Sequence, residues 1–342
     1  MEEKRNFDLL TLGQVLLRLS PPNNDRLVRG DTFVKQVGGA ELNVAVGVAL
    51  LGLRTGVISK LPSHDMGSFM KGKIRSYGVS DDFFMYDDSP SARVGIYYYE
   101  NGAYPRKPKV IYDRANSSFY SLKIDEIPEK AYTASRCFHT SGITLALSPK
   151  VRETTIEMIK RFKAAGTLVS FDVNFRGNLW TGEEAKECIE QILPYVDIFF
   201  CSEDTARLTF KKTGTAREMM KSFTEEYPIS IVASPQRIVH SPKSHTFGSI
   251  IYDARKDIYY EEEPYRDIDV VDRIGSGDAY ISGALYGLLT SNFDCEKAVR
   301  YGNATSAVKN TIPGDLPSSD LEEIETIIKA HNQTGFQSEM AR

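Results

Sequence analysis

A short segment near the C-terminal end of the sequence combines small residues and carboxylates in an order that suits phosphate chemistry. Residues 272–280 read Asp-Arg-Ile-Gly-Ser-Gly-Asp-Ala-Tyr, after a β-type run and before a helical run from Ala279 to Leu289. Gly275, Ser276 and Gly277 would leave the backbone accessible, and the first N–H groups of a helix have no partner within that helix. Together these groups can surround an anion.

Asp278 follows this turn and stands in the first turn of the predicted helix. Its charge would repel a bound phosphate unless a substrate hydroxyl lay between them. Asp278 would then accept the hydroxyl proton while backbone amides stabilise a transferring phosphoryl group. A strand–helix turn whose acidic residue merely favours the helix dipole explains the same residues equally well. No GxxxxGK[ST] motif occurs, so any nucleotide phosphate would depend on this segment.

A pair of glycines begins an earlier helix. Gly38 and Gly39 precede a run of small residues that extends to Leu51 and ends at Gly52, with Asn43 one turn from the start. The glycines could permit close packing against a strand, which the residues alone favour. Alternatively, they let a substrate approach the backbone, and Asn43 supplies a hydrogen-bond donor and an acceptor.

The elements that must position these segments alternate along the chain. Strands are predicted at 7–17, 55–59, 136–139, 168–172, 198–201, 229–233 and 247–252, and helices at 67–77, 149–165, 183–193, 203–210, 216–226, 295–310 and 321–330. This alternation indicates parallel βαβ units, whose ligands lie off the carboxyl ends of the strands. Asp172, Asn174 and Arg176 follow one such strand. Arg176 could hold a carboxylate or phosphate by a two-pronged hydrogen bond, although a surface position is commoner for an arginine.

Two β-type runs, 93–100 and 109–112, interrupt the alternation and are separated by a turn that contains glycine and proline. They predict a hairpin or small sheet that projects from the main body. The consecutive residues Tyr97 to Tyr99 must point to alternating faces. One face could cover a ligand or a partner subunit, and aromatic residues that only stiffen the hairpin are an equal alternative.

The composition limits the classes of partner. The chain has 342 residues, 41% of them hydrophobic, and a formal net charge of −4, so it has no overall basic field for nucleic acid or anionic membrane. The charged N-terminus does not suit a signal peptide and no run approaches a membrane span, so we expect a cytoplasmic protein. Four widely spaced cysteines argue against a zinc site or disulfides. His240 and His245 fall in a polar stretch that we interpret as a solvated loop.

Two of these segments carry a resemblance to a known family. Gly38-Gly-Ala-Glu-Leu-Asn43 and Asp272-Arg-Ile-Gly-Ser-Gly-Asp278 resemble, in order and separation, the two signatures of the ribokinase-like (PfkB) sugar kinases. Within that family the sequence looks most like the 2-keto-3-deoxygluconate kinases. This closer similarity rests on segments spread from about Leu9 to Asp315, among them Leu17-Arg-Leu-Ser-Pro-Pro22, Tyr112-Asp-Arg-Ala115, Phe138-His-Thr-Ser-Gly-Ile-Thr144, Phe171-Asp-Val-Asn-Phe-Arg176 and Thr311-Ile-Pro-Gly-Asp315.

The resemblance implies a single kinase domain over residues 1–334, built as a three-layer α/β/α sandwich with a mainly parallel central sheet. Segments of about 14–37 and 91–115 would form a small β-sheet lid, and residues 335–342 would be a frayed tail. The chain would use ATP and Mg²⁺ to phosphorylate a hydroxyl of a small-molecule sugar acid. The charge balance predicts no nucleic-acid or membrane partner, and because exposed aromatic sheets seldom stay uncovered, we expect a homo-oligomer through the tyrosine-rich lid.

The resemblance also implies roles for individual residues. Asp278 would be the general base, and Gly275, Ser276 and Gly277 would form the anion hole. The sugar would be bound by Gly38, Gly39, Asn43, Tyr97, Tyr99 and Arg114, with Arg176 on the substrate carboxylate. The nucleotide would be bound by Ser202, Thr205, Ser234 and Asn303 together with Gly275 and Gly277, and Glu203 would be a ligand of Mg²⁺.

The nucleotide side departs from the family pattern. Ser202 and Thr205 replace the usual Asn-x-x-Glu element, and Ser234-Pro-Gln236 replaces a Thr-x-Gly turn. Proline removes an N–H group, and loss of the glycine removes backbone freedom. Gln14 stands where glutamate is commoner. Three hypotheses stay open: a 2-keto-3-deoxygluconate kinase or close sugar-acid kinase, a PfkB kinase of another sugar such as fructose or a ketohexose derivative, and a sugar-acid-binding relative with weakened nucleotide binding.

Overall fold

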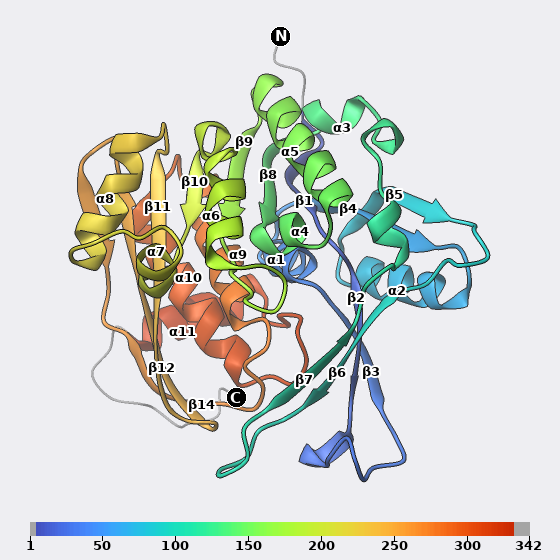
Figure 1. Cartoon of the computed structure of the whole chain (residues 1–342). Helices are drawn as coiled ribbons and strands as arrows, with labels where there is room; N and C mark the ends of the chain where they lie inside the picture. The colour runs from blue at the N-terminus through green and yellow to red at the C-terminus, as the bar shows by residue number, and fades with distance from the viewer. Residues whose placement is uncertain (1–4, 332–342) are drawn as a thin grey trace.

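The computed structural model describes residues 5–331, and the predicted tail at 335–342 lies outside the described residues. Its central sheet has ten strands, in the order β13-β12-β11-β10-β9-β8-β1-β4-β5, with β14 beside β12 (Figure 1). The strands are β1 (Phe7–Leu12), β4 (Thr55–Pro62), β5 (Ser80–Asp87), β8 (Ser135–Ser141), β9 (Leu168–Asp172), β10 (Ile198–Phe200), β11 (Ile231–Ser241), β12 (Ser244–Asp253), β13 (Ile258–Glu261) and β14 (Tyr265–Asp269).

Most of this sheet is parallel, as the alternation predicts. Every neighbouring pair from β11 to β5 is parallel. β12 pairs antiparallel with β11, β13 and β14. The sequence prediction that extended the parallel alternation to residues 247–252 is therefore wrong. No helix separates β11 from β12, and adjacent strands joined by a tight turn must run antiparallel.

Helices cover both faces of the sheet (Figure 1). One face carries α1 (Ala40–Leu50), α9 (Ser276–Thr290), α10 (Cys295–Asn310) and α11 (Leu321–His331). The other carries α3 (Lys130–Thr133), α4 (Gly142–Ala146), α5 (Pro149–Ala164), α6 (Gly182–Glu190), α7 (Glu203–Leu208) and α8 (Ala216–Glu226). Successive residues of β1 enter different cores, since Leu9 belongs to the same buried cluster as Leu285 of α9, and Leu10 to the same cluster as Phe162 of α5. This alternation of buried apolar side chains produces the predicted three layers.

A second, four-stranded sheet lies beside the body in the order β3-β2-β6-β7. It consists of β2 (Leu16–Ser20), β3 (Val34–Gly38), β6 (Gly95–Glu100) and β7 (Lys109–Asp113), and α2 (Asp65–Ser76) packs between it and β5. β6 and β7 form the predicted antiparallel hairpin. Short 3₁₀ turns at 22–24, 118–121, 124–126 and 193–195 complete the described elements.

The predicted single strand 7–17 is divided between the two sheets. β1 ends at Leu12, and β2 begins at Leu16 in the small sheet. A Cβ atom on Gly13 would lie 2.1 Å from a carboxylate oxygen of Glu41, so the crossing point has no room for a side chain. The apolar run continues across this break because both strands are buried, which is why the sequence reads as one strand.

The polar stretch around the two histidines is also not a loop, and the prediction of a solvated loop is wrong. β11 pairs with β10 only through residues 231–233 and then continues as a two-stranded ribbon with β12. His245 lies on β12 and is buried, and His240 hydrogen bonds to Thr246 over 2.9 Å. Burial, followed by the charges of Arg237 and Arg273, lowers the pKa of His245 to about 4. Pairing between the two strands satisfies the backbone, so the polar composition does not prevent a hairpin.

The four cysteines are buried free thiols. No helix within residues 5–331 is long and apolar enough to cross a membrane.

Candidate active site

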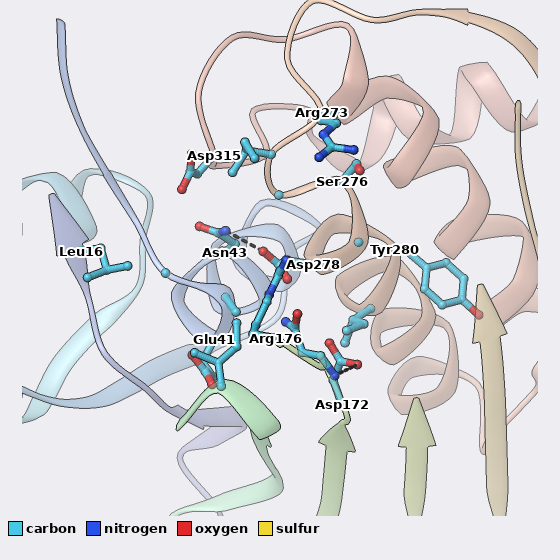
Figure 2. A pocket seen from close by; sticks show the side chains of 18 of the residues that line it. Leu16, Glu41, Asn43, Asp172, Arg176, Arg273, Ser276, Asp278, Tyr280 and Asp315 are labelled. Carbon is cyan, nitrogen blue, oxygen red and sulfur yellow. Dashed lines mark hydrogen bonds between the residues drawn. The ribbon is translucent and has the colours of Figure 1, made fainter. Parts of the chain in front are cut away.

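A cleft of about 370 Å³ lies where the body meets the small sheet. Its walls come from the beginnings of α1 and α9, from the segment after β9, from β11, and from the small sheet (Figure 2). The carboxyl ends of parallel strands are the usual ligand-binding edge of such a sheet. Residues of both glycine-rich segments line this cleft, although the segments are more than 200 residues apart in sequence.

The N-terminus of α9 forms one end of the cleft. Gly275 precedes the helix with φ of 81°, and a Cβ atom there would lie 2.0 Å from the carbonyl oxygen of Asp315. Only glycine fits this left-handed conformation and close contact. A Cβ atom on Gly277 would meet nothing within 4 Å, so this position leaves open space beside the helix. Because α9 begins at Ser276, three residues earlier than predicted, its first amides lie in the glycine-rich segment.

Asp278 lies in the first turn of α9 and faces Asn43 of α1. The Asn43 Nδ2 group donates a hydrogen bond of 2.7 Å to Asp278 Oδ2. Burial raises the pKa of Asp278 to about 7, while Asn43 and the positive charge of Arg176 partly oppose this increase. Figure 2 shows the Arg176 side chain directed toward Asp278. A carboxylate with this pKa can accept and release a proton near neutral pH.

Asp172, at the end of β9, is a second carboxylate in the cleft. Its Oδ1 accepts a hydrogen bond of 3.1 Å from the backbone of Asn174. Burial and then the charge of Asp278 raise its pKa to about 7. The sequence indicated that Asp172 would follow a strand at the ligand-binding edge, but the glycine motifs did not assign it a role.

The wall opposite α9 consists of paired polar groups. Glu41 Oε1 accepts hydrogen bonds from the hydroxyls of Ser141 (2.6 Å) and Thr144 (2.7 Å). Arg114 Nε donates to Gln14 Oε1 over 2.7 Å, and burial lowers the pKa of Arg114. Since Gln14 is neutral, this contact holds the guanidinium without cancelling its charge.

A buried ion network joins the small sheet to the glycine-rich segment before α9. Arg18 of β2 forms ion pairs with Asp272 and, over 2.7 Å, with Asp315. The Tyr97 hydroxyl also donates to Asp315. Asp272 in turn accepts from the backbone N–H of Ile274 over 3.0 Å. Two segments that flank the α9 N-terminus are thus tied to β2, the first strand of the small sheet.

The cleft contains most of the residues predicted for the sugar and the reaction. Those that line it are Gly39, Asn43, Tyr97, Arg114, Arg176, Gly275, Ser276, Gly277 and Asp278. Gly38 lies behind the surface, where a Cβ atom would be 2.1 Å from an Asp315 carboxylate oxygen. Tyr99 is buried beside an adjacent hollow between the small sheet and the β11–β12 hairpin. The packing interpretation of the early glycines therefore suits Gly38, and the open-backbone interpretation suits Gly39.

Of the residues predicted for the nucleotide, Gly275 and Gly277 line the cleft, and the other four lie outside it. Ser202 caps α7 by accepting from the backbone of Thr205, and their hydroxyls are 2.9 Å apart. Ser234 is buried on β11, where Ser234-Pro-Gln236 continues an extended strand and forms no turn. Asn303 is also buried and bonds to Ser249 (2.7 Å) and Glu262 (3.1 Å). None of these four residues lines the cleft.

The predicted metal ligand, Glu203, pairs with Arg207 over 2.8 Å on the exposed side of α7. Among residues 5–331, no group of three or more His, Cys, Asp or Glu side chains is arranged to hold a metal ion. Mg²⁺ commonly keeps several waters and binds through substrate phosphates with one or two carboxylates. The donor set therefore does not fit a magnesium cage built from the protein.

Two arginines in the cleft were missed by the sequence analysis. Arg237 extends from β11 and Arg273 precedes the α9 N-terminus. Burial, then the charges of Arg273 and Arg176, lower the pKa of Arg237. Arg237 could have been found from its spacing. It lies two residues after Pro235, alternate residues of a strand share a face, and both residues line the cleft. The interpretation of this stretch as a loop prevented that prediction.

The three-layer fold, the small sheet and the cleft at the α9 N-terminus define a ribokinase-like carbohydrate phosphotransferase. The family model for the "pfkB family carbohydrate kinase" matches residues 6–320, so the chain belongs to this family. It is therefore a sugar kinase, which transfers a phosphoryl group to a sugar hydroxyl.

Curated relatives and solved structures resemble the chain over nearly its full length. A 2-dehydro-3-deoxygalactonokinase of Haloferax volcanii is 34% identical over 322 residues, covering 94% of this chain and 96% of the relative. A 5-dehydro-2-deoxygluconokinase of Listeria monocytogenes is 27% identical, covering 95% and 97%. The crystal structure of 2-dehydro-3-deoxygluconokinase from Thermotoga maritima has a TM-score of 0.89 at 31% identity, covering 94% and 99%.

A more distant structure, an Escherichia coli putative ribokinase II in complex with ATP and Mg²⁺, has a TM-score of 0.79 at 22% identity and covers 94% of this chain and 99% of that one. It supports the fold.

Proposed function

We propose that the chain phosphorylates a 2-keto-3-deoxy sugar acid, with 2-keto-3-deoxygluconate as the first candidate, at the expense of ATP. The observation that carries this proposal is the position of Asp278, a carboxylate of raised pKa between the α9 N-terminus and Asn43. Arg114 and Arg176 add positive charge to the same cleft. A neutral sugar would have less use for those two charges.

In the proposed reaction, a sugar hydroxyl lies between Asp278 and the γ-phosphoryl group of ATP. Asp278 accepts the hydroxyl proton as the sugar oxygen forms its bond to phosphorus. The bond between the γ-phosphorus and the bridging β–γ oxygen breaks, and ADP leaves with that electron pair. The first amides of α9, at Ser276 and Gly277, stabilise the charge on the transferring group. Asn43 holds Asp278 in position through its 2.7 Å hydrogen bond.

The carboxylate of the substrate would be bound by Arg176. Its guanidinium is exposed to the cleft and can form two parallel hydrogen bonds to a carboxylate. Arg114 would contribute a second positive charge from the small-sheet side, because its partner Gln14 is neutral. A glutamate at position 14, as is commoner in the family, would cancel the charge of Arg114. Gln14 would leave that charge available to the substrate carboxylate.

The names of the relatives suggest the main alternatives. The Haloferax volcanii relative is named for 2-dehydro-3-deoxygalactonate, which differs from the gluconate compound in configuration at C4. The Listeria monocytogenes relative is named for 5-dehydro-2-deoxygluconate, also a sugar acid. Both keep the carboxylate that Arg176 would bind. A neutral ketose such as fructose lacks it and is the second candidate class.

Mg²⁺ would enter with the nucleotide, as the phosphates of ATP require charge neutralisation. Glu203 does not suit the role of ligand, because it pairs with Arg207 outside the cleft. No step above depends on a metal held by the protein.

The small sheet would serve as both lid and oligomer interface. Phe33 contacts Tyr98 of β6, which pairs with Ile111 of β7, and both Phe33 and Ile111 are exposed apolar side chains. An exposed apolar surface is commonly covered by a partner. A second copy of the chain would be that partner.

The decisive experiment is a phosphorylation assay on a substrate panel. Purified protein would be mixed with ATP, Mg²⁺ and, in turn, 2-keto-3-deoxygluconate, its C4 epimer, 5-keto-2-deoxygluconate, gluconate and fructose. ADP release would be measured together with the mass of the product. Turnover of a keto-deoxy acid with an added phosphoryl group supports the proposal. Turnover of fructose alone would refute it, and binding of the acids without turnover would favour a binding protein.

A further inference from the structure

The β11–β12 hairpin brings a charged group to the cleft that neither glycine motif supplies. Beyond residues 231–233, β11 leaves the parallel sheet and pairs only with β12. This extension presents Pro235 and Arg237, two residues apart on the same strand face, to the cleft. The strand thus crosses the edge where the carboxyl ends of β9 and β10 face the ligand space.

Arg273 approaches the same space from the segment before α9. Figure 2 shows Arg273 and Ser276 on one side of Asp278, with Asn43 and Glu41 on the other. Arg273 is two residues from Gly275, so its side chain belongs to the phosphate end of the cleft, apart from the wall formed by Gln14 and Arg114.

The carboxylates that adjoin the segment before α9 do not neutralise these arginines. Asp272 and Asp315 both pair with Arg18, and Asp272 also accepts backbone hydrogen bonds. Within residues 5–331, Arg237 and Arg273 form no ion pair with an acidic side chain. His245 is uncharged near neutral pH because its pKa is about 4. Two neighbouring cations without a partner favour a ligand that carries several negative charges.

We propose that Arg237 and Arg273 form a clamp for the phosphate chain of the nucleotide, opposite the α9 amides. The inference rests on the proposed kinase function and deepens it, because it supplies phosphate contacts in a chain that lacks the usual Asn-x-x-Glu and Thr-x-Gly elements. Arginine suits this role, since its planar group makes paired hydrogen bonds to phosphate oxygens. Arg176, on the other side of Asp278, remains with the carboxylate of the sugar acid.

The test compares binding of three ligands by calorimetry: inorganic tripolyphosphate, ADP and 2-keto-3-deoxygluconate. Arg237→Ala and Arg273→Ala should each weaken tripolyphosphate and ADP binding about 10- to 100-fold, the loss typical of a hydrogen bond to a charged group. Affinity for the sugar acid should change less than about threefold. In kinetic assays the KM for ATP should rise, and Arg237→Lys should restore part of the loss because it keeps the charge.

Arg266→Ala is the matched control, as this exposed arginine of β14 has Glu263 as its one ion-pair partner within residues 5–331. It should bind all three ligands as the unaltered protein does. The clamp is refuted if the unaltered protein does not bind tripolyphosphate or if the two variants bind it normally. It is also refuted if the variants lose affinity for the sugar acid and keep their affinity for tripolyphosphate. These results are independent of turnover: arginine-dependent phosphate binding without sugar phosphorylation would support the clamp and refute the kinase proposal.

Discussion

The two sides of the cleft differ in how their charges are balanced. On the side of the small sheet, Arg18 is paired with Asp272 and Asp315, and Glu41 accepts hydrogen bonds from two hydroxyls. On the side of β11, Arg237 and Arg273 both line the cleft, the charge of Arg273 helps to lower the pKa of Arg237, and neither has an acidic partner among the described residues. The small-sheet side is held mainly by internal pairs, with only the charge of Arg114 left uncancelled beside neutral Gln14, whereas neither arginine on the β11 side has an acidic partner.

This difference suits the two substrates that we propose. A sugar hydroxyl must be held within hydrogen-bonding distance of Asp278, and fixed neighbours such as Asn43 provide that precision. A nucleotide brings its own dense negative charge, so unpaired arginines can bind it strongly. We call the side of Arg18 and Glu41 the prearranged side, and the side of Arg237 and Arg273 the unpaired side. Four changes test the contrast between them.

The largest effect is expected for Asp278→Asn, which keeps the shape of the side chain but removes the base. The turnover number kcat should fall roughly 10³-fold, within the usual range for loss of general base catalysis. Binding of 2-keto-3-deoxygluconate should be nearly intact, because Asn43 and the arginines remain. Steady-state kinetics and calorimetry measure the two quantities. Retention of the normal rate would exclude Asp278 as the base.

Arg18→Met tests the prearranged side through stability. Removing Arg18 leaves Asp272 and Asp315 buried without their cation, and losing one partner of a buried ion pair costs about 3–5 kcal/mol. The free energy of unfolding, measured in urea, should fall by that amount. A loss below about 1 kcal/mol would mean that the network does not hold the small sheet to the body.

The pH dependence should report the raised pKa of Asp278. Because only the deprotonated form is a base, kcat should rise about tenfold per pH unit below pH 7 and level off above it. Stability should change in the opposite sense. The folded state holds the proton up to about pH 7, whereas the unfolded carboxyl releases it near 3.8, so stability decreases as pH rises between these values.

The Asp278→Asn variant has no carboxyl at this position, so it should lack the loss of stability that Asp278 causes as pH rises. The variant should therefore be more stable than the unaltered protein at pH 8 but not at pH 4. Thermal unfolding at the two pH values measures this. An equal difference at both would place the pKa of Asp278 in its ordinary range.

The smallest effect is expected for Arg237→Met, the counterpart of Arg18→Met on the unpaired side. No ion pair is lost and repulsion from Arg273 is relieved, so the free energy of unfolding should change by less than about 0.5 kcal/mol or rise slightly. Urea unfolding of the two methionine variants side by side gives the comparison. A loss for Arg237→Met as large as that for Arg18→Met would show that Arg237 is structurally paired.

Much of the fold could be predicted because its signals are local. The helix at 216–226 and the hairpin of β6 and β7 follow from periodicity and turn residues within a short window. Glycine at 275 could be assigned to a special backbone conformation for the same reason. The divided strand at 7–17 could not be predicted, because both halves are buried and only the distant Glu41 explains the break at Gly13.

The site was predictable where it coincides with a sequence motif and less so elsewhere. Asp278 and Asn43 belong to such motifs, and their contact follows from packing of α1 against α9. Arg18 joins the buried network, and Arg237 reaches the cleft, only through pairings with segments far away in the chain. A polar stretch such as 236–245 has no local feature that distinguishes a hairpin from a loop. Tertiary contacts decided both cases.

The most direct test of a sugar-acid kinase is the ratio of kcat/KM for 2-keto-3-deoxygluconate to that for fructose, in the unaltered protein and in Arg176→Ala. We expect a strong preference for the acid in the unaltered protein. The alanine variant should lower kcat/KM for the acid at least about tenfold, and that for fructose little, because one charged contact is lost. An unchanged ratio, or a preference for fructose from the outset, would contradict the assignment of this cleft to a sugar acid.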